Sequence, residues 1–561
     1  MKGTAPAIPD QVDVLVIGGG INGISAFREL ALQGVNVVLL ERDDFCSGAS
    51  AALSRMVHGG LRYLENGEFR LVRQSLQERD RLLKNAPHCV SPLPTVVPIS
   101  SWVSGTLPTI AGFFGARVKA HRRPGLMIRA GLLLYDLLTR HSRTMPRHRG
   151  LSRAALRAMV PGITESAVGG VLYFDARVSL PERLGLEMIL DTEADTGARA
   201  FSYTEIVGSE AGQIRWLDRL SGASGSIAPR VVINATGAWV DIVGSTIRPG
   251  ANSKRVHGTK GSHLMIRNPE LQAALGDHMV YYENHDGRIC IAFAHAGAAM
   301  VGSTDILIDD PDSAVCFEDE KNYMLEALGN VFPHLTVKEE QIVHTFTGVR
   351  PLPVSVQGAT GRISRDHSVD IEPAGRQPFA VLTLIGGKWT TFRVFGEEVA
   401  DLALAELGQA RSVDTCDLKI GGGRNLPAGE RERVAWISRC AANAGLSETR
   451  FSALVSRYGS RAETVAGFMA EGDDEALASA PDYSQRELLF LIRHERVREI
   501  GDLLLRRTTL GIEGRIDAAL TSEIVALMAS AFGWSDEETS KAVARFNQTI
   551  QHRHRIQHQI A

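Results

Sequence analysis

The sequence predicts an α/β fold in which a Rossmann-type dinucleotide-binding domain is interleaved with an antiparallel-sheet substrate domain and followed by an α-helical C-terminal domain. Three observations carry this prediction. Residues 12–41 contain a strand, a glycine turn, a helix and a second strand in order. Residues 255–345 contain short strand-like runs separated by turns. From Arg424 onward the apolar residues recur at helical spacing.

The glycine turn follows a short, apolar and largely β-branched strand. Gly18, Gly20 and Gly23 match the G-x-G-x-x-G template, in which they allow a tight turn, close approach to a pyrophosphate and helix packing. The second strand, residues 35–40, ends at Glu41, where a carboxylate accepts hydrogen bonds from ribose hydroxyls. We therefore predict dinucleotide binding, and the alternative is a glycine-rich turn in an ordinary α/β protein.

The remaining elements follow from periodicity, flanking turn residues and helix caps. Ser484 with Glu487 and Ser535 with Glu538 match the capping-box pattern. The predicted helices are residues 74–85, 126–138, 181–197 and 390–404, and the predicted strands are 200–207, 213–217, 230–233, 279–282, 288–292, 299–303 and 379–385.

Composition excludes several classes of protein. With 44% hydrophobic and 22% charged residues, the 561-residue chain is globular. Its 61 basic and 64 acidic residues give a net charge of −3, so we expect no nucleic-acid partner. The six cysteines are scattered without a C-x-x-C pair, which argues against a zinc site or disulfides and favours a reducing compartment. We expect no metal, and we interpret the histidine-containing tail at 552–558 as solvated.

Two further absences bear on location. The first strand begins near residue 12, which leaves no room for a cleavable signal, and there is no run of 18 apolar residues that would span a membrane.

Beyond Glu41, blocks of small and functional residues recur along most of the chain, including His-Gly-Gly-Leu-Arg-Tyr at 58–63. In order and spacing they resemble the FAD-dependent glycerol-3-phosphate dehydrogenases and oxidases. The blocks are residues 54–65, 68–72, 86–88, 234–239, 260–263, 302–305, 348–352, 364–366 and 386–391, with a weaker continuation at 493–497.

This resemblance implies non-covalent FAD, oxidation of sn-glycerol 3-phosphate to dihydroxyacetone phosphate and transfer of electrons to a membrane quinone. Three alternatives remain open: a dehydrogenase of another polyol phosphate such as erythritol phosphate, an oxygen-using oxidase, and a flavin-binding protein without turnover. Retention of Arg62, His263, Arg350 and Lys388 argues against the last, because binding FAD alone would not require them. The resemblance is compatible with a homodimer, and the residues do not fix the oligomeric state.

The resemblance also implies which residues contact FAD. The family's Ser/Thr-rich run before the His-Gly-Gly motif is largely replaced here by Gly48, Ala49, Ala51 and Ala52, and Arg55 stands where a lysine is usual. The implied contacts are Gly18, Gly19, Gly20, Ile21, Asn22, Gly23, Glu41, Arg42, Ser50, Ser54, His58, Gly59, Gly60, Ala235, Thr236, Gly237, Trp239, Gly387, Lys388, Trp389 and Thr390.

A substrate that carries a phosphate requires side chains that bind this phosphate. A guanidinium donates two parallel hydrogen bonds to phosphate, so Arg62 and Arg350 are the candidate phosphate contacts, with Tyr63 adding a hydroxyl. For any one of these arginines the alternative is a structural ion pair.

Catalysis calls for a base, and His58 and His263 are the candidates because a histidine titrates near neutrality. Sequence alone does not rank them, and each could instead be a buried structural histidine. Lys388, at a strand-to-helix junction, is positioned to contact substrate or to stabilise negative charge on the flavin, or simply to cap the turn.

The domain boundaries follow from these blocks and from a change of composition near residue 410. We assign residues 1–75, 150–255 and 346–408 to the FAD-binding domain, 76–149 and 256–345 to the substrate or cap domain, and 410–561 to the helical C-terminal domain.

Residues 102–149 are the stretch suited to a membrane surface. Trp102 and Phe113 lie in an apolar part that is too short and interrupted to cross a bilayer, and a strongly basic run follows it. We therefore expect a cytoplasmic protein that docks peripherally on the inner face of the cell membrane. The alternative is that the apolar residues pack under the flavin domain.

Overall fold

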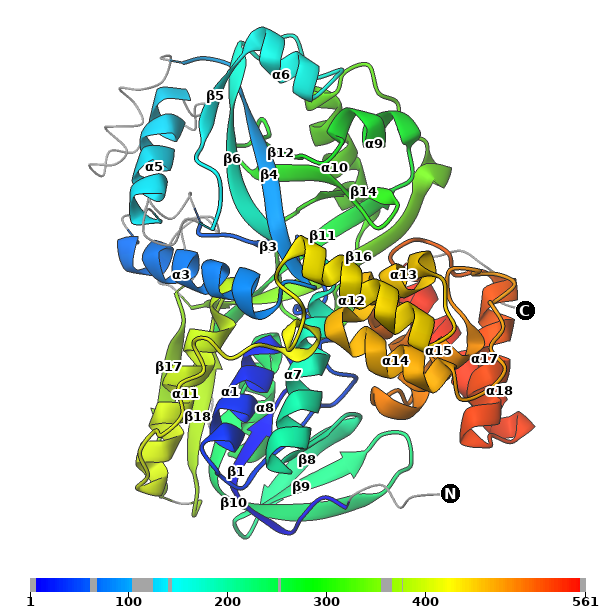
Figure 1. Ribbon diagram of the computed structural model, residues 1–561. Helices are drawn as coiled ribbons and strands as arrows, with labels where there is room; N and C mark the ends of the chain where they lie inside the picture. Colours follow the sequence, from blue (N-terminus) through cyan, green and yellow to red (C-terminus); the bar gives the residue numbers. More distant parts are fainter. Residues whose placement is uncertain are drawn as a thin grey trace.

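The computed structural model describes residues 7–60, 68–102, 125–139, 144–250, 254–354, 366–375 and 377–554. These residues form two sheets and a helical domain packed beside them (Figure 1). In the described part of the chain, every helix is too short or too polar to cross a lipid bilayer.

The first sheet is built around the strand that precedes the glycine turn. Its order is β17-β18-β10-β1-β2-β7, and all neighbours are parallel except β17 and β18. A β8–β9 hairpin continues from β10. The strands are β1 (Gln11–Ile17), β2 (Val37–Leu40), β7 (Arg199–Phe201), β8 (Thr204–Glu210), β9 (Gln213–Asp218), β10 (Ser224–Asn234), β17 (Ser368–Glu372) and β18 (Ala380–Ile385).

Both faces of this sheet are covered, which explains why its strands are apolar on both sides. Helices α1 (Ile21–Leu32), α7 (Pro181–Thr196) and α11 (Phe392–Leu407) bury one face, and the other packs against the β8–β9 hairpin and α8 (Val240–Ile247). The carboxyl ends of the parallel strands meet at one edge, where an α/β sheet binds its ligand.

The second sheet is the mainly antiparallel one. Its order is β15-β11-β14-β13-β12-β4-β6-β3, with β16 paired to β11, β5 paired to β6, and one parallel pair, β12 with β4. The strands are β3 (Met56–Val57), β4 (Val90–Ile99), β5 (Arg149–Ser152), β6 (Gly169–Val178), β11 (Val256–Ile266), β12 (Met279–Glu283), β13 (Ile289–His295), β14 (Ala298–Gly302), β15 (Ile306–Ile308) and β16 (Ile342–Pro353).

Helices flank this sheet at several places. Its core includes residues of α6 (Arg153–Met159), α9 (Pro269–Leu275) and α10 (Glu318–Val331). Helix α3 (Phe69–Asn85) lies at the level where the two sheets meet, and α5 (Gly125–Leu138) stands above it beside the second sheet (Figure 1).

Sheet membership differs from the domain assignment made from sequence. β6 lies within residues 150–255 and most of β16 lies within 346–408, both assigned to the FAD-binding domain, yet both strands belong to the second sheet. β3 also joins it from within residues 1–75. The chain therefore crosses between the sheets more often than contiguous blocks allow, because pairing partners far apart in sequence complete each sheet.

The helical domain has its own core, and Figure 1 shows it beside both sheets. It contains α12 (Glu430–Asn443), α13 (Glu448–Tyr458), α14 (Ala462–Met469), α15 (Gln485–His494), α16 (Ile500–Asp502), the π-helix η8 (Leu503–Arg507), α17 (Ala518–Phe532), α18 (Asp536–Thr549) and η9 (Ile550–His554). The solvated-tail interpretation is wrong for His554, which stacks on His344 with ring centroids 4.6 Å apart and hydrogen-bonds Thr345.

Candidate active site

The glycine turn has the geometry its template requires. Gly18 adopts φ of 107°, and a Cβ there would lie 2.7 Å from the Ala235 carbonyl oxygen. A Cβ on Gly23 would lie only 2.0 Å from the Gly18 carbonyl oxygen. The turn therefore brings the ends of β1 and β10 and the start of α1 into contact, and only glycine fits at these two positions.

Glu41 lies at the end of β2, as expected, and contacts the turn directly. Its carboxylate accepts hydrogen bonds from the Gly19 amide at 2.6 Å and from the Asp43 amide at 2.8 Å. Burial and the nearby Asp43 raise the pKa of Glu41 to about 7. Hydroxyl donors from a ribose would stabilise the ionised form, so this carboxylate suits the group predicted to bind there.

The start of α1 contains an unpaired polar atom. The Ser50 hydroxyl accepts a hydrogen bond from the Ile21 amide at 2.9 Å, whereas the buried Asn22 Oδ1 has no hydrogen-bond partner among the described residues. The same holds for the Trp389 indole Nε1. Both atoms are inaccessible and lie within the packed protein. The turn itself fits the pyrophosphate of a dinucleotide, because Gly18 and Gly23 leave no room for a Cβ and the N-cap Gly20 makes no side-chain capping bond at the start of α1.

The predicted contacts at the end of β10 form the other wall of the cradle. The Ala235 amide donates to the Ile17 carbonyl, and Thr236 is held by Asn234 through a 2.7 Å hydrogen bond. The Arg42 guanidinium lies 5.1 Å from the centroid of the Trp239 ring and pairs with Asp312 at 2.8 Å. Arg42 thus connects the end of β2 with the segment between β15 and α10.

The segment with Gly59 and Gly60 is held from beneath by a buried cluster. The Gly59 amide donates to the Tyr135 hydroxyl at 2.9 Å and to Asp175 at 3.3 Å. The Tyr135 hydroxyl donates to Asp175 at 2.5 Å, and Arg79 pairs with Asp175 at 3.0 Å. Sequence analysis missed this role of Tyr135, because its partners are 40 and 76 residues away.

Arg55, which stands in place of the family's lysine, is a structural ion pair. Its guanidinium pairs with Glu182 at 3.0 Å, and both side chains are at most 5% exposed. It also donates to the Ser179 carbonyl at 2.8 Å. The arginine that departs from the family pattern is therefore paired within the protein interior.

His263 lies on β11 and is fully buried. Its Nε2 hydrogen-bonds the Ser54 hydroxyl at 2.9 Å, and its ring stacks on Phe346 with centroids 5.0 Å apart. Burial, followed by the charges of Arg350 and Arg55, lowers the pKa of His263 to about 3. The sequence predicted a near-neutral pKa for this histidine, and the buried site lowers that pKa instead.

Arg350 shares a face of the second sheet with His263. It lies opposite Thr259 on the paired strand, and Thr259, Gly261 and His263 alternate onto one side. A Cβ on Gly261 would lie 2.2 Å from an Arg350 guanidinium nitrogen, so the guanidinium covers that glycine. It pairs with Asp305 at 3.1 Å.

The same face contacts the FAD-binding side of the molecule. A Cβ on Gly348 would lie 2.8 Å from the Ala52 methyl group, and Ser54 reaches His263. The alanine that departs from the family's hydroxyl-rich run therefore packs directly against the second sheet.

A buried carboxylate braces this part of the second sheet. Glu320 pairs with Lys260 at 2.5 Å and accepts hydrogen bonds from Ser262 at 2.9 Å and Thr304 at 2.6 Å. Burial opposes ionisation, but these donors lower the pKa of Glu320. The network fixes the two motifs that contain His263 and Asp305.

Lys388 and His58 complete the described candidates. The Lys388 ammonium donates to the Ser75 hydroxyl at 3.4 Å, and the His58 amide donates to the Thr390 hydroxyl at 3.3 Å. These contacts join the segment after β18 to α3 and to the His-Gly-Gly motif. Arg62 and Tyr63 lie outside the described residues.

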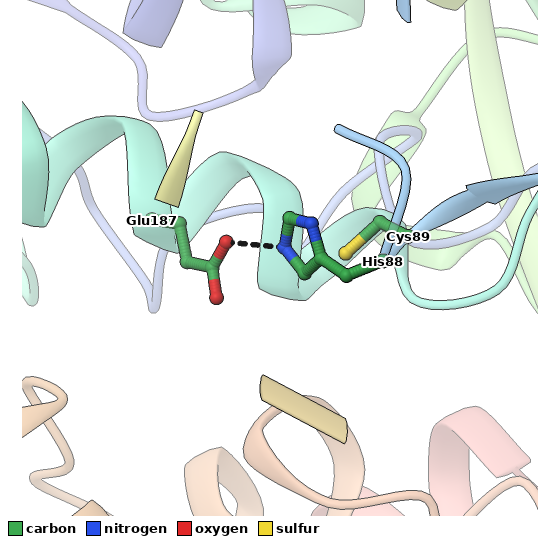
Figure 2. Close-up of side chains that lie close together, drawn as sticks. All are labelled: His88, Cys89 and Glu187. Carbon is green, nitrogen blue, oxygen red and sulfur yellow. Dashed lines mark hydrogen bonds and ion pairs between the residues drawn. The ribbon is translucent and has the colours of Figure 1, made fainter. Parts of the chain in front are cut away.

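One further group has the composition of a metal site. Ligand atoms of His88, Cys89 and Glu187 lie within 4.8 Å of one another (Figure 2). The His88 Nε2 and a Glu187 oxygen form a 2.7 Å hydrogen bond, and the Gly422 amide donates to the same oxygen. Burial opposes charge, but Cys89 and Glu187 raise the pKa of His88 well above its ordinary value. We interpret the group as an ion pair that holds the η6 glycines (Gly421–Gly423) against α7.

Comparisons with known proteins agree with this geometry. A family model described as FAD dependent oxidoreductase matches residues 13–402, and one described as the C-terminal domain of alpha-glycerophosphate oxidase matches residues 413–539. The fold and the cradle thus define an FAD-dependent oxidoreductase with an added helical domain.

Individual relatives show which FAD-dependent oxidoreductases the chain resembles. A glycerol-3-phosphate dehydrogenase from Synechocystis sp. is 31% identical over 562 residues, covering 96% of each chain. A D-erythritol 1-phosphate dehydrogenase from Brucella abortus is 29% identical, covering 90% of this chain and 95% of that protein. The crystal structure of a glycerol-3-phosphate dehydrogenase from Bacillus halodurans with FAD shares the fold, with a TM-score of 0.76, 23% identity and coverage of 97% and 95%. The chain belongs to the FAD-dependent glycerol-3-phosphate dehydrogenase and oxidase family.

Proposed function

We propose that the protein oxidises sn-glycerol 3-phosphate to dihydroxyacetone phosphate and passes the electrons to a membrane quinone. The observation that carries the proposal is the shared sheet face of His263 and Arg350, which puts a neutral imidazole and a guanidinium opposite the FAD-binding loop. A secondary alcohol with a phosphate tail needs both groups.

Each residue has a separate role in this proposal. Arg350, with Arg62, holds the phosphate, and Asp305 releases the guanidinium when the phosphate binds. His263 remains neutral because of its low pKa, so it can accept a hydrogen bond from the carbinol hydroxyl. Its Nε2 is bound to Ser54 and its Nδ1 is buried, so the ring must be uncovered before either nitrogen contacts substrate.

FAD, when bound, supplies the acceptor for the hydrogen on the carbinol carbon. The protein's task is to orient that carbon and to take up the hydroxyl proton. A phosphate dianion near His263 would raise its pKa, because a negative charge favours the imidazolium. His58 remains the alternative base, since its amide is fixed by Thr390 beside the same motif.

Anaerobic bleaching of the flavin absorbance tests the substrate. We expect glycerol 3-phosphate to bleach the flavin rapidly and longer polyol phosphates to do so more slowly. The reverse order, with erythritol phosphate faster, would favour the activity named for the Brucella relative. A protein that retains FAD and is bleached by none of these compounds would refute the proposal.

The electron acceptor is tested separately. The family description of residues 413–539 refers to an oxidase, so oxygen is the competing acceptor. Turnover with a soluble quinone analogue and little peroxide would support the dehydrogenase assignment. Stoichiometric peroxide without added quinone would establish an oxidase.

We also propose that FAD is bound without a covalent link, because the sequence contains no evident attachment motif. Acid precipitation should release a yellow supernatant. Colour that remains in the protein pellet would show covalent attachment.

A further inference from the structure

The segment from Glu41 to Ser50 binds the glycine turn at three points. Glu41 accepts the Gly19 amide, the Cys46 amide donates to the Gly19 carbonyl at 2.9 Å, and the Ser50 hydroxyl accepts the Ile21 amide. We call residues 41–50 the cofactor loop. Its position decides whether Gly19 and the start of α1 present their amides to a pyrophosphate.

Asp44, in the middle of this loop, points into the helical C-terminal domain. The Arg507 guanidinium binds both carboxylate oxygens of Asp44, at 2.7 and 2.8 Å, and Arg506 pairs with the same carboxylate. The Asp44 side chain is 0% exposed and that of Arg507 is 1% exposed. Both arginines come from the π-helix η8, more than 460 residues away along the chain.

The contact is part of a closed arrangement of charges. Arg506 also pairs with Asp502 at 2.7 Å, and Asp502 accepts a hydrogen bond from the Tyr203 hydroxyl at 2.6 Å. The Tyr203 amide in turn donates to the Asp43 carbonyl of the cofactor loop at 2.9 Å. Burial opposes the charge of Asp44, but Arg507 and Arg506 lower its pKa, so the carboxylate is ionised.

The ion pairs of Asp44 constrain the position of the cofactor loop. Two buried aspartates, the buried Arg507 and the largely buried Arg506, which is 13% exposed, are costly to desolvate, and they stabilise only when the geometry is fixed. Here they fix a loop whose opposite side binds the glycine turn. Because the loop and the turn are joined by three hydrogen bonds, displacement of Asp44 displaces Gly19.

We propose that the C-terminal domain positions the cofactor loop through Arg507 and Arg506, and thereby sets how tightly the protein retains FAD. The inference rests on the proposed contacts of Glu41 and Ser50 with FAD. Arg507 and Arg506 are positioning residues that act through Asp44 and do not touch the cofactor. The competing explanation is that the pair merely holds two domains together.

The test compares Arg507→Met with Arg457→Met. Arg457 pairs with Glu487 at 2.9 Å, and the 0% exposed Glu487 carboxylate is shared with a second arginine, Arg450, as Asp44 is shared by Arg507 and Arg506. Arg457 lies on α13 and Glu487 on α15, so this pair joins two helices inside the C-terminal domain. Each variant leaves a buried carboxylate short of a partner, so each should lower the melting temperature of the apoprotein.

The readout is the rate at which flavin fluorescence appears as FAD dissociates, measured without substrate. We expect Arg507→Met to release FAD about tenfold faster or more, whereas Arg457→Met should stay within about twofold of the native rate. Equal release rates in the two variants would overturn the proposal and leave the pair as an interdomain contact.

Two additional variants keep the result interpretable. Asp44→Asn preserves shape but removes the charge, and it serves if Arg507→Met does not fold. Faster release in the folded Asp44→Asn protein supports the proposal, and a native release rate contradicts it. Glu41→Ala tests the cradle itself: unchanged FAD affinity there would refute the proposed FAD contact of Glu41, while the Arg507→Met comparison would still decide the role of the C-terminal domain.

Discussion

Arg350 is paired with Asp305, so a phosphate that binds Arg350 must compete with an existing partner. We predict that Arg350→Ala lowers kcat/KM for glycerol 3-phosphate about ten- to a hundredfold, the equivalent of about 1.5–3 kcal/mol for a lost charge-assisted contact. The FAD content should not change. Steady-state kinetics and the visible absorbance of the purified variant measure the two quantities.

The matched control is Arg230→Ala. Arg230, on β10, pairs with Asp13 at 3.1 Å, and the Arg230 side chain is 59% exposed. This variant should behave like the native enzyme, because exposed pairs contribute little. If the two variants had the same kinetics, the proposed contact between Arg350 and the phosphate would be wrong.

His263 makes the folded state sensitive to acid. Its pKa is about 3 in the folded protein but near 6.5 when unfolded, so the unfolded chain binds more protons between these values. Stability should therefore fall as the pH decreases from about 6.5 toward 3. His554, with a pKa lowered to about 4 by burial, acts in the same direction.

The measurement is the free energy of unfolding in urea at several pH values. His263→Asn should show a shallower loss of stability below about pH 6.5 than the native protein, because one titrating group is absent. Parallel curves for the two proteins would mean that His263 is not buried as the structure has it.

The family resemblance predicts that His263 and Arg350 share a site, and in the structure both lie on one sheet face. The sequence did not predict the low pKa of His263, since burial and the charge of Arg350 arise only from pairing of β11 with β16. Their roles remain proposals, as do those of Arg62 and Tyr63.

At the scale of elements, α5 supports the His-Gly-Gly motif through one side chain. Tyr135 joins the Gly59 amide, Asp175 and Arg79. We predict that Tyr135→Phe lowers the free energy of unfolding by about 1–3 kcal/mol, because it leaves buried polar groups short of a partner. It should also shift the visible spectrum of bound flavin, since Gly59 and Gly60 are proposed contacts.

Tyr282→Phe is the matched control. Tyr282 is as buried as Tyr135, each 3% exposed, but its hydroxyl has no hydrogen-bond partner in the described part of the chain. Removal of that hydroxyl should cost little and leave the flavin spectrum unchanged. Equal thermal stabilities of the two variants would show that the Tyr135 network does not hold the loop.

Most elements were predictable because their periodicity is local. The helix predicted at 181–197 is α7, and the strand at 213–217 is β9. The single strand predicted at 200–207 is wrong: Tyr203 adopts φ of 58° and divides it into β7 and β8. A positive φ at a tyrosine has no sequence signal.

Helix caps also depend on tertiary contacts that the local sequence does not reveal. Ser535 and Glu538 form the predicted reciprocal capping box. At the other site Ser484 caps the Glu487 amide, but the Glu487 carboxylate binds Arg450, Arg457 and Tyr458 instead. Tertiary partners from α13 compete with the local cap, and the buried ion pairs use the carboxylate.

On the scale of the whole molecule, α5 presents one face to the protein and another outward. Tyr135 and Leu132 are buried, whereas Leu126, Leu133 and Leu137 are 54%, 61% and 56% exposed. These three leucines recur at helical spacing. The basic and aromatic residues expected to flank them, including Phe113 and Arg122, lie outside the described residues.

An enzyme that reduces a quinone must reach the bilayer, and the outward face of α5 is suited to lipid contact. We predict that the protein sediments with anionic liposomes and that Leu133→Ser with Leu137→Ser reduces this binding. Salt should weaken binding as well, because basic residues near anionic lipid each contribute about 1 kcal/mol that ions screen. The control is Leu307→Ser, since Leu307 is also 61% exposed but lies on β15 at the opposite end of the second sheet. Equal sedimentation of both variants would show that α5 is not the anchor, and the helical C-terminal domain would become the surface to test.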